Sequence, residues 1–188
     1  MNYRIDHLAF RTLNKSKAVK FLCDAIGYKE VTEFQIDFNK AENDFAICSV
    51  LEPCNRCDVK LLPWLHTLSI GSIEQEYVLS PEIFVSEGSL GSIVQTWASA
   101  RCGAGLHHIA MQVQEDSTVE EEMKKWLNKG WCESFTSKEP FKCDEMSQVF
   151  TTPSSLLGVV FELIKRKEAG FCKNSVLSLM ESTRDLSI

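Results

Sequence analysis

Apolar and polar residues alternate in two stretches of the chain that closely resemble each other. Ile5–Thr12 and Leu106–Val113 both follow this pattern, which is typical of a strand that buries one face. Each stretch carries a histidine at the same register, His7 in the first and His108 in the second. A repeated strand with a repeated candidate ligand predicts a duplicated module that builds one metal site between its two copies.

A helix is predicted after each of these strands. In the first copy Asn14 or Ser16 can cap the helix and Gly27 ends it. In the second copy the segment 117–120 has the pattern of a capping box, and Gly130 ends the helix. The two apolar stripes consist of Ala18, Leu22, Ala25 and Ile26, and of Val119, Met123, Trp126 and Leu127.

Strand-like stretches follow each helix, and they complete the predicted modules. They lie near residues 30–36, 44–50 and 77–85 in the first half, and near residues 133–137, 147–151 and 159–164 in the second. The order in each half is therefore strand, helix and about three strands, which predicts an α+β fold. We assign residues 1–88 to the first module, 89–104 to a connecting segment, 105–166 to the second module and 167–188 to a C-terminal tail.

Two further helices are predicted outside the repeat. Ile93, Val94 and Trp97 have helical spacing in the connecting segment. In the tail, a short amphipathic helix is predicted from the spacing of Val176, Leu177, Met180 and Leu186.

Composition and charge narrow the classes of function. The chain has 188 residues, of which 44% are hydrophobic and 24% charged, so it can bury a core. Its net charge of −6 disfavours nucleic acid as the main partner. We expect no membrane span, because no apolar run approaches the roughly 20 residues that one requires. The absence of an apolar signal core near the N-terminus makes the cytoplasm the expected location.

Eight cysteines are present, and reduced thiols are expected for a protein without an export signal. Cys54 and Cys57 have CxxC spacing, but no second pair completes a zinc site. We interpret this pair as a turn with two thiols, with a zinc or redox role as the less favoured alternative.

Glu162 lies in the middle of an apolar stretch, 159–164. A carboxylate there either faces solvent or, if buried, requires a partner or a metal ion. Together with His7 and His108 it could form a triad that leaves three positions open on a six-coordinate metal, a ligand set that suits non-haem Fe(II). His107 is expected on the opposite face of its strand, so register selects His108 as the ligand. His66 receives no role.

At these residues the chain resembles the vicinal oxygen chelate superfamily, and in particular the catalytic half of 4-hydroxyphenylpyruvate dioxygenases. Residues 103–110 are similar to that family's G-x-G-V-Q-H-I-A segment, and residues 147–153 to its L-Q-I-F-T-K-P strand. Residues 161–167, followed by Gly170 and Phe171, resemble its F-E-I-I-Q-R-K and G-F-G signature. The resemblance spans essentially the whole chain.

The resemblance implies two tandem βαβββ modules that form a curved mixed sheet around a central cavity. It implies that His7, His108 and Glu162 bind the metal, that Gln148 lies near the substrate, and that the tail forms a helix closing the site. The implied activity is that of an Fe(II) dioxygenase acting on a small substrate with adjacent oxygens, such as a 2-oxo acid. A homodimer is expected by analogy.

Departures from the family pattern lie in the substrate shell. His107 replaces the glutamine before the second histidine, Ser92–Val94 lacks another glutamine, and Val176 stands at the place of a tail phenylalanine. The spacing between His108 and Glu162 is also shorter than in the dioxygenase. We therefore expect a substrate other than 4-hydroxyphenylpyruvate.

Two alternatives remain open. One is a redox-neutral lyase, isomerase or epimerase of the glyoxalase type, in which Glu82 is a fourth ligand and Zn²⁺, Co²⁺, Mn²⁺ or Ni²⁺ replaces iron. One register of the alignment instead puts Phe84 at this position. The other alternative is a non-catalytic small-molecule-binding protein, a class that usually lacks the three ligands.

Overall fold

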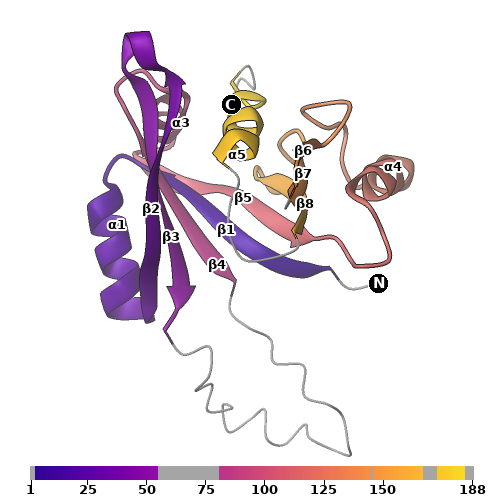
Figure 1. Ribbon diagram of the computed structural model, residues 1–188, viewed down its shortest axis with the longest axis horizontal. Coiled ribbons are helices and arrows are strands. Elements are labelled where there is room, and N and C mark those ends of the chain that lie inside the picture. The colour runs from indigo at the N-terminus through magenta and orange to yellow at the C-terminus, as the bar shows by residue number, and fades with distance from the viewer. Residues whose placement is uncertain (1–2, 55–80, 145, 167–172, 185–188) are drawn as a thin grey trace, which may run out of the picture.

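The computed structural model describes residues 3–54, 81–144, 146–166 and 173–184. Their strands form one curved, mixed, eight-stranded sheet in the order β2-β3-β4-β1-β5-β8-β7-β6 (Figure 1). The strands are β1 (Arg4–Thr12), β2 (Tyr28–Asn39), β3 (Asp44–Pro53), β4 (Glu82–Gly88), β5 (Ala104–Gln112), β6 (Phe141–Cys143), β7 (Met146–Phe150) and β8 (Val160–Arg166). The helical segments are α1 (Lys15–Phe21), η1 (Leu22–Ile26), η2 (Lys40–Glu42), α3 (Ile93–Ser99), α4 (Val119–Lys129) and α5 (Lys173–Glu181).

The strand order is symmetric about the middle of the sheet. β1 and β5 pair antiparallel at the centre, β1 pairs parallel with β4, and β5 pairs parallel with β8. Reading outward from the centre, each half therefore places its first strand, its last strand and then the two others. This arrangement confirms the α+β fold with two related strand-helix-strand-strand-strand units around a concave face.

Local capping signals begin and end the two repeated helices. The Asn14 side chain accepts a hydrogen bond from the Lys17 amide at the start of α1, and Gly27 takes a left-handed conformation with φ 85° after η1. Thr118 and Glu121 form the capping box of α4, one residue later than the predicted segment, and Gly130 ends that helix with φ 66°. The predicted caps are thus confirmed, with one shift of a single residue.

The end of the first repeated helix departs from its predicted apolar stripe. Val19 is buried, whereas Ala25 and Ile26 are exposed. The last turn, η1, is wound as a π-helix, so the 3.6-residue period loses its phase there. Leu127 at the end of α4 is also exposed.

Two strand predictions need correction. The stretch 133–137 forms only an isolated bridge between Phe135 and Thr151, and the strand of that region is β6. The stretch 77–85 is described from residue 81 onward, and the strand begins at Glu82. Helices in the connecting segment and the tail, α3 and α5, are confirmed, while Leu186 of the predicted tail stripe lies outside the described residues.

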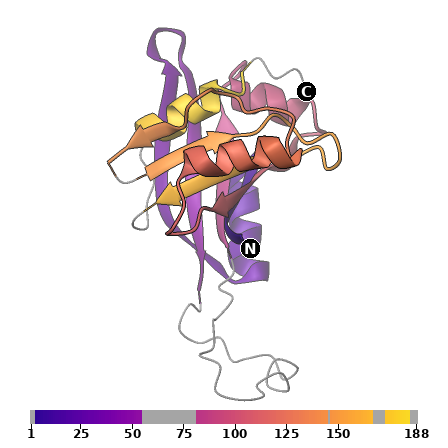
Figure 2. The ribbon, with the colours of Figure 1, turned by 90° about the vertical axis from the view of Figure 1, so that its right-hand side faces the viewer.

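Helix α5 covers the concave face of the sheet. It contacts β2 in the first half and β6 and β7 in the second, and it lies between the two ends of the curved sheet in Figure 1. Its side chains Val176 and Met180 pack against Ala9 and Phe84 on the inner face. By contrast, α4 packs against the outer side of β7 and β8 (Figure 2). The sheet and α5 therefore enclose a space between them.

Candidate metal centre

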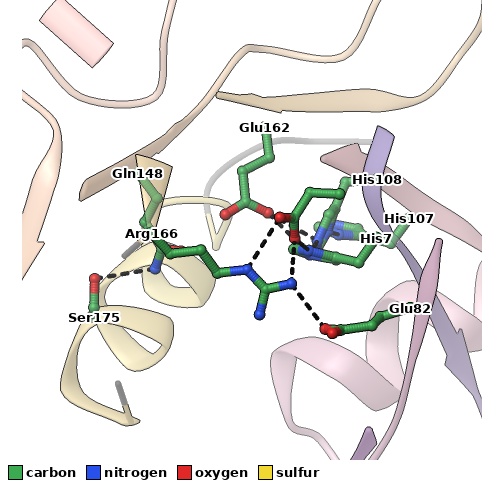
Figure 3. Close-up of polar contacts among 9 residues, drawn as sticks. His7, Glu82, His107, His108, Gln148, Glu162, Arg166 and Ser175 are labelled. Atoms are coloured by element: carbon green, nitrogen blue, oxygen red, sulfur yellow. Dashed lines mark hydrogen bonds and ion pairs between the residues drawn. The ribbon is translucent and has the colours of Figure 1, made fainter. Parts of the chain in front are cut away.

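Three side chains from adjacent central strands converge on one point inside this space. His7 Nε2 lies 3.1 Å from His108 Nε2, and Glu162 Oε2 lies 3.3 Å and 3.2 Å from these two atoms. The three residues come from β1, β5 and β8 and are buried. Figure 3 shows their polar ends directed toward one another.

This group fits a divalent metal ion. Three ligands at right angles around an ion, each about 2.1 Å away, would lie about 3.0 Å apart, and the observed spacing is close to this. Neither carboxylate oxygen of Glu162 has a well-aligned hydrogen-bond donor among the described residues. A buried carboxylate in that condition is costly unless a cation neutralises it. Two imidazoles and one carboxylate form such a cation site.

The electrostatics of the group are asymmetric. Burial alone would lower the pKa of His7, but the charges of Glu162 and Asp6 outweigh it and raise the pKa to about 9. Burial lowers the pKa of His108 to about 4 despite the same Glu162 carboxylate. Burial would raise the pKa of Glu162, but the two histidines lower it to about 2. The carboxylate is thus ionised at neutral pH, and any proton in the metal-free group resides on His7.

A shift of register beside each histidine shapes the site. Between β1 and β5, Ala9 pairs with His108 while Phe10 pairs with Leu106, so β5 contains one extra residue at His107. A bulge of this kind redirects side chains that would otherwise alternate. A second shift follows Ile5 in β1, next to His7.

His107 consequently lines the same cavity as His108, and the prediction that it faces the opposite side is wrong. Its Nδ1 lies 2.8 Å from His108 Nδ1. The period of two holds only while the ladder is regular, and the bulge interrupts the ladder at this residue.

A buried ion network supports His7 from behind. Asp6 Oδ1 lies 2.8 Å from His7 Nδ1, and Arg166 donates to Asp6 Oδ2 at 3.0 Å. Arg166 also donates to Glu82 Oε2 at 2.9 Å (Figure 3). A carboxylate on the second nitrogen of a ligand histidine fixes its tautomer and raises its basicity. Asp6 is placed to play this role if His7 binds a metal, and Arg166 ties β8 to β1 and β4.

Glu82 lies outside the converging group, and Phe84 takes the symmetric position. On β8, Glu162 pairs with Ala110, two residues beyond the histidine of β5. On β4, the residue that pairs with Ala9, two residues beyond His7, is Phe84. Glu82 pairs instead with His7 itself and binds Arg166. In the structure the counterpart of Glu162 is therefore an apolar ring.

The cavity in front of the group is lined by both halves of the sheet and by α5. It spans about 430 Å³ counted out to its mouth. Gln148, predicted near the substrate, is buried, lines the cavity and donates from Nε2 to Ser175 Oγ at 3.0 Å. Val176, Leu179 and Met180 of α5 form its apolar cover.

Arg11 also lines the cavity, and the sequence predictions did not include it. The residue is only 2% exposed. The signal was available, since His7, Ala9 and Arg11 alternate on one strand and share a face by the period of two. Phe150, which also lines the cavity, follows Gln148 with the same spacing on β7.

Cys54 does not line this cavity. Cys54 is exposed with a free thiol, and Cys57 and His66 lie outside the described residues, as do Gly170 and Phe171. No helix in the described ranges is long and apolar enough to cross a membrane.

Comparisons with known proteins support the fold. No family model matches the chain, and no curated protein matches it. Among solved structures, a variant of 4-hydroxymandelate synthase from Streptomyces coelicolor aligns with a TM-score of 0.67 and 14% identity over 97% of this chain. The chain spans 53% of the length of that synthase.

Smaller proteins align over nearly their whole length. A methylmalonyl-CoA epimerase aligns with a TM-score of 0.55 and 19% identity, covering 89% of this chain and 99% of the epimerase. A hypothetical protein from Bacillus halodurans aligns with a TM-score of 0.58 and 19% identity, covering 92% of this chain and 100% of its own. The synthase and the epimerase are vicinal oxygen chelate folds, and the described chain has this fold.

Proposed function

We propose that this chain is an Fe(II)-dependent oxygenase of the vicinal oxygen chelate type, with His7, His108 and Glu162 as the metal ligands. Three observations support a metal at this point: the spacing of 3.1 to 3.3 Å, the burial of the three side chains, and a Glu162 carboxylate that no described residue donates a well-aligned hydrogen bond to. Zn²⁺, Co²⁺, Mn²⁺ and Ni²⁺ suit the same donor atoms, so the metal that is bound depends on metal availability as well as on the geometry of the site.

The position of Phe84 is the observation that favours an oxygenase over the alternatives. Its position opposite Ala9 is the symmetric counterpart of Glu162, and a phenylalanine offers no ligand atom. Glu82, the alternative fourth ligand, has its carboxylate engaged by Arg166. Three protein ligands leave three positions on a six-coordinate ion, which suffice for two substrate oxygens and O₂.

A ferrous ion bound here would supply electrons and Lewis acidity to a substrate with two adjacent oxygens, such as a 2-oxo acid. The chain supplies position and exclusion of water. Gln148 is held by Ser175, so its carboxamide can orient a polar substrate group. Val176, Leu179 and Met180 cover the cavity with apolar surface and keep bulk water from the reacting groups.

The metal-dependent binding step tests this proposal. Anaerobic protein with Fe(II) and a panel of 2-oxo acids should develop a weak visible charge-transfer band, and O₂ should then be consumed in proportion to substrate. His108→Ala should lose the band, while His107→Gln should keep it because His107 is not a proposed ligand. Absence of a band with every acid, in protein shown to contain iron, would contradict the proposal.

A redox-neutral epimerase or lyase is the second candidate. The near-complete alignment with methylmalonyl-CoA epimerase favours it, since that protein has almost the same extent as this chain. Such an enzyme would exchange the hydrogen next to a substrate carbonyl with solvent in the absence of O₂. Deuterium uptake from D₂O under argon, without O₂ consumption in air, would select this candidate. Stoichiometric ligand binding with neither reaction would select a non-catalytic binding protein.

A homodimer stays a prediction, and sedimentation velocity can measure the oligomeric state.

A further inference from the structure

Arg11 is a buried cation without a counter-charge among the described residues. Within the described part of the chain its only hydrogen bond is a long one, 3.4 Å from Nη2 to Thr183 Oγ1. No carboxylate in the described ranges forms an ion pair with it. Burying a guanidinium in this way is expensive unless an anion arrives to pair with it.

The neighbours of Arg11 do not supply that anion. Burial raises the pKa of the Cys48 thiol to about 12, so Cys48 is uncharged. Trp97 presents its ring 5.7 Å from the guanidinium, and Arg101 lies over the same ring at 4.1 Å. Burial lowers the pKa of Arg11 to about 9, which still leaves it charged at neutral pH. The end of the cavity near Trp97 is therefore cationic.

His107 adds a hydrogen-bond donor in the same place. If His108 binds a metal through Nε2, its Nδ1 keeps the proton and must donate to His107 Nδ1, 2.8 Å away. His107 must then carry its own proton on Nε2. That atom is buried and has no hydrogen-bond partner among the described residues. The His107 ring also packs against Trp97, with ring centroids 5.3 Å apart, so it borders the wall that Arg11 faces.

Arg11 lies at a distance from the proposed metal ligand His7 along β1. His7 and Arg11 are four residues apart on the cavity face, which corresponds to about 13 Å between their Cα atoms. The side chain of Ala9 between them is small and lines the cavity. A substrate held at the metal could therefore extend along β1 as far as the guanidinium.

We propose that Arg11, with the Nε2–H of His107, forms a subsite for a second anionic group of the substrate, remote from the atoms that chelate the metal. The preferred substrates are then 2-oxo acids with a terminal carboxylate or a similarly charged group. Arg11 is a specificity residue in this arrangement, because it contacts the substrate away from the reacting atoms. This inference rests on the proposed function for the identity of the chelating end.

Matched pairs of acids test the subsite by calorimetry. Protein loaded with Zn²⁺, which binds without turnover, is titrated with 2-oxopentanedioate and 2-oxohexanedioate and with 2-oxopentanoate and 2-oxohexanoate. The wild type should prefer the better-fitting diacid over its monoacid by roughly tenfold or more, the range of a charge-assisted bidentate contact. Arg11→Met should reduce this preference to about twofold or less and leave monoacid affinity nearly unchanged.

Arg101→Met is the matched control. It removes the same charge from the same tryptophan ring, but Arg101 does not line the cavity. The diacid preference should survive in this variant. A preference that persists in Arg11→Met, or that both variants lose equally, would overturn the subsite.

Stability provides a readout independent of the metal. If Arg11 is kept for ligand binding, the metal-free Arg11→Met protein should melt at the same temperature as wild type or higher, by roughly 2–4 °C. Sulfate or inorganic phosphate should raise the Tm of metal-free wild type and Arg101→Met more than that of Arg11→Met. A lower Tm for Arg11→Met with an unchanged anion response would assign Arg11 to structure and refute the inference.

The two proposals fail in different ways. If no monoacid binds in a metal-dependent manner, the proposed function fails, and the anion response of the metal-free protein still decides the subsite. If monoacids bind and the diacid preference does not depend on Arg11, the proposed function stands and the subsite fails.

Discussion

The two halves of the sheet share one plan but contribute unequally to the site. Each places a histidine on its inner strand, next to a shift of register, and each has a polar residue just before that histidine. The second half adds Glu162, whereas the first half has Phe84 at the matching position. Behind the ligands, Asp6 contacts His7 and His107 contacts His108. The scaffold is symmetric, and the chemistry depends on where the symmetry is broken.

This difference explains why the site can remain open. A second carboxylate at the Phe84 position would close one coordination position and favour acid–base chemistry. The aromatic ring instead provides an apolar wall 6.3 Å from the His7 ring, measured between centroids. Under the proposed function, the first half thus contributes one ligand and an apolar wall, and the second half contributes two ligands.

Replacing Glu162 on β8 or Glu82 on β4 by glutamine should give the largest difference between the two halves. Glu162→Gln should weaken metal binding by about a thousandfold or more, because it removes a charged ligand. Glu82→Gln should leave the metal content unchanged. It should lower the free energy of unfolding by about 1–3 kcal/mol, a limited loss because Arg166 still has its ion pair with Asp6. Metal analysis and denaturant unfolding provide the readouts. Equal loss of metal in both variants would restore Glu82 as a ligand.

Placing a carboxylate at the symmetric position should make the halves equivalent. Phe84→Glu should destabilise the metal-free protein by about 3 kcal/mol or more, through loss of the ring and burial of a charge. Zn²⁺ should recover much of that loss, and O₂ consumption should fall. Phe84→Leu is the control, since it provides no ligand atom. Thermal unfolding with and without Zn²⁺ measures this recovery. If Zn²⁺ stabilises Phe84→Glu no more than Phe84→Leu, position 84 is not equivalent to position 162.

The residues behind the two histidines should differ in their effect on metal affinity. Asp6→Asn should reduce affinity by about 10–100-fold, as expected for loss of a carboxylate that orients a ligand histidine. His107→Gln, which keeps a neutral partner, should cost less than about tenfold. Competition with a chelator measures both. A larger loss of metal affinity in His107→Gln than in Asp6→Asn would contradict the stronger orienting role assigned to Asp6.

Protons should compete with the metal in the first half only. The pKa of His7 is raised to about 9 in the metal-free group, so a metal must displace a proton below that pH, whereas His108 is already neutral. Apparent affinity should therefore rise by about tenfold per unit between pH 6.5 and 8 and level off near pH 9. Asp6→Asn should move the plateau to lower pH. A metal affinity that does not change with pH over this range would show that His7 does not carry the proton in the metal-free protein.

The same shift predicts a pH dependence of folding. A group whose pKa is higher in the folded protein stabilises it fully below the unfolded value and loses that contribution as pH rises through the folded value. For His7 this window runs from about 6.5 to about 9. The metal-free protein should lose stability across this window, and the metal-loaded protein should not.

Local patterns along the chain were enough to predict two strand-helix repeats, their caps and three candidate ligands. These features depend on local periodicity and on short hydrogen-bonded caps, which neighbouring residues specify. Which residues surround the candidate ligands became clear from the three-dimensional arrangement of the strands. The bulge that turns His107 inward, the register that selects Phe84 over Glu82, and the lack of a counter-charge for Arg11 among the described residues all depend on how distant segments pack. Because a shift of one residue moves a side chain to the other face of a sheet, no local pattern could settle them.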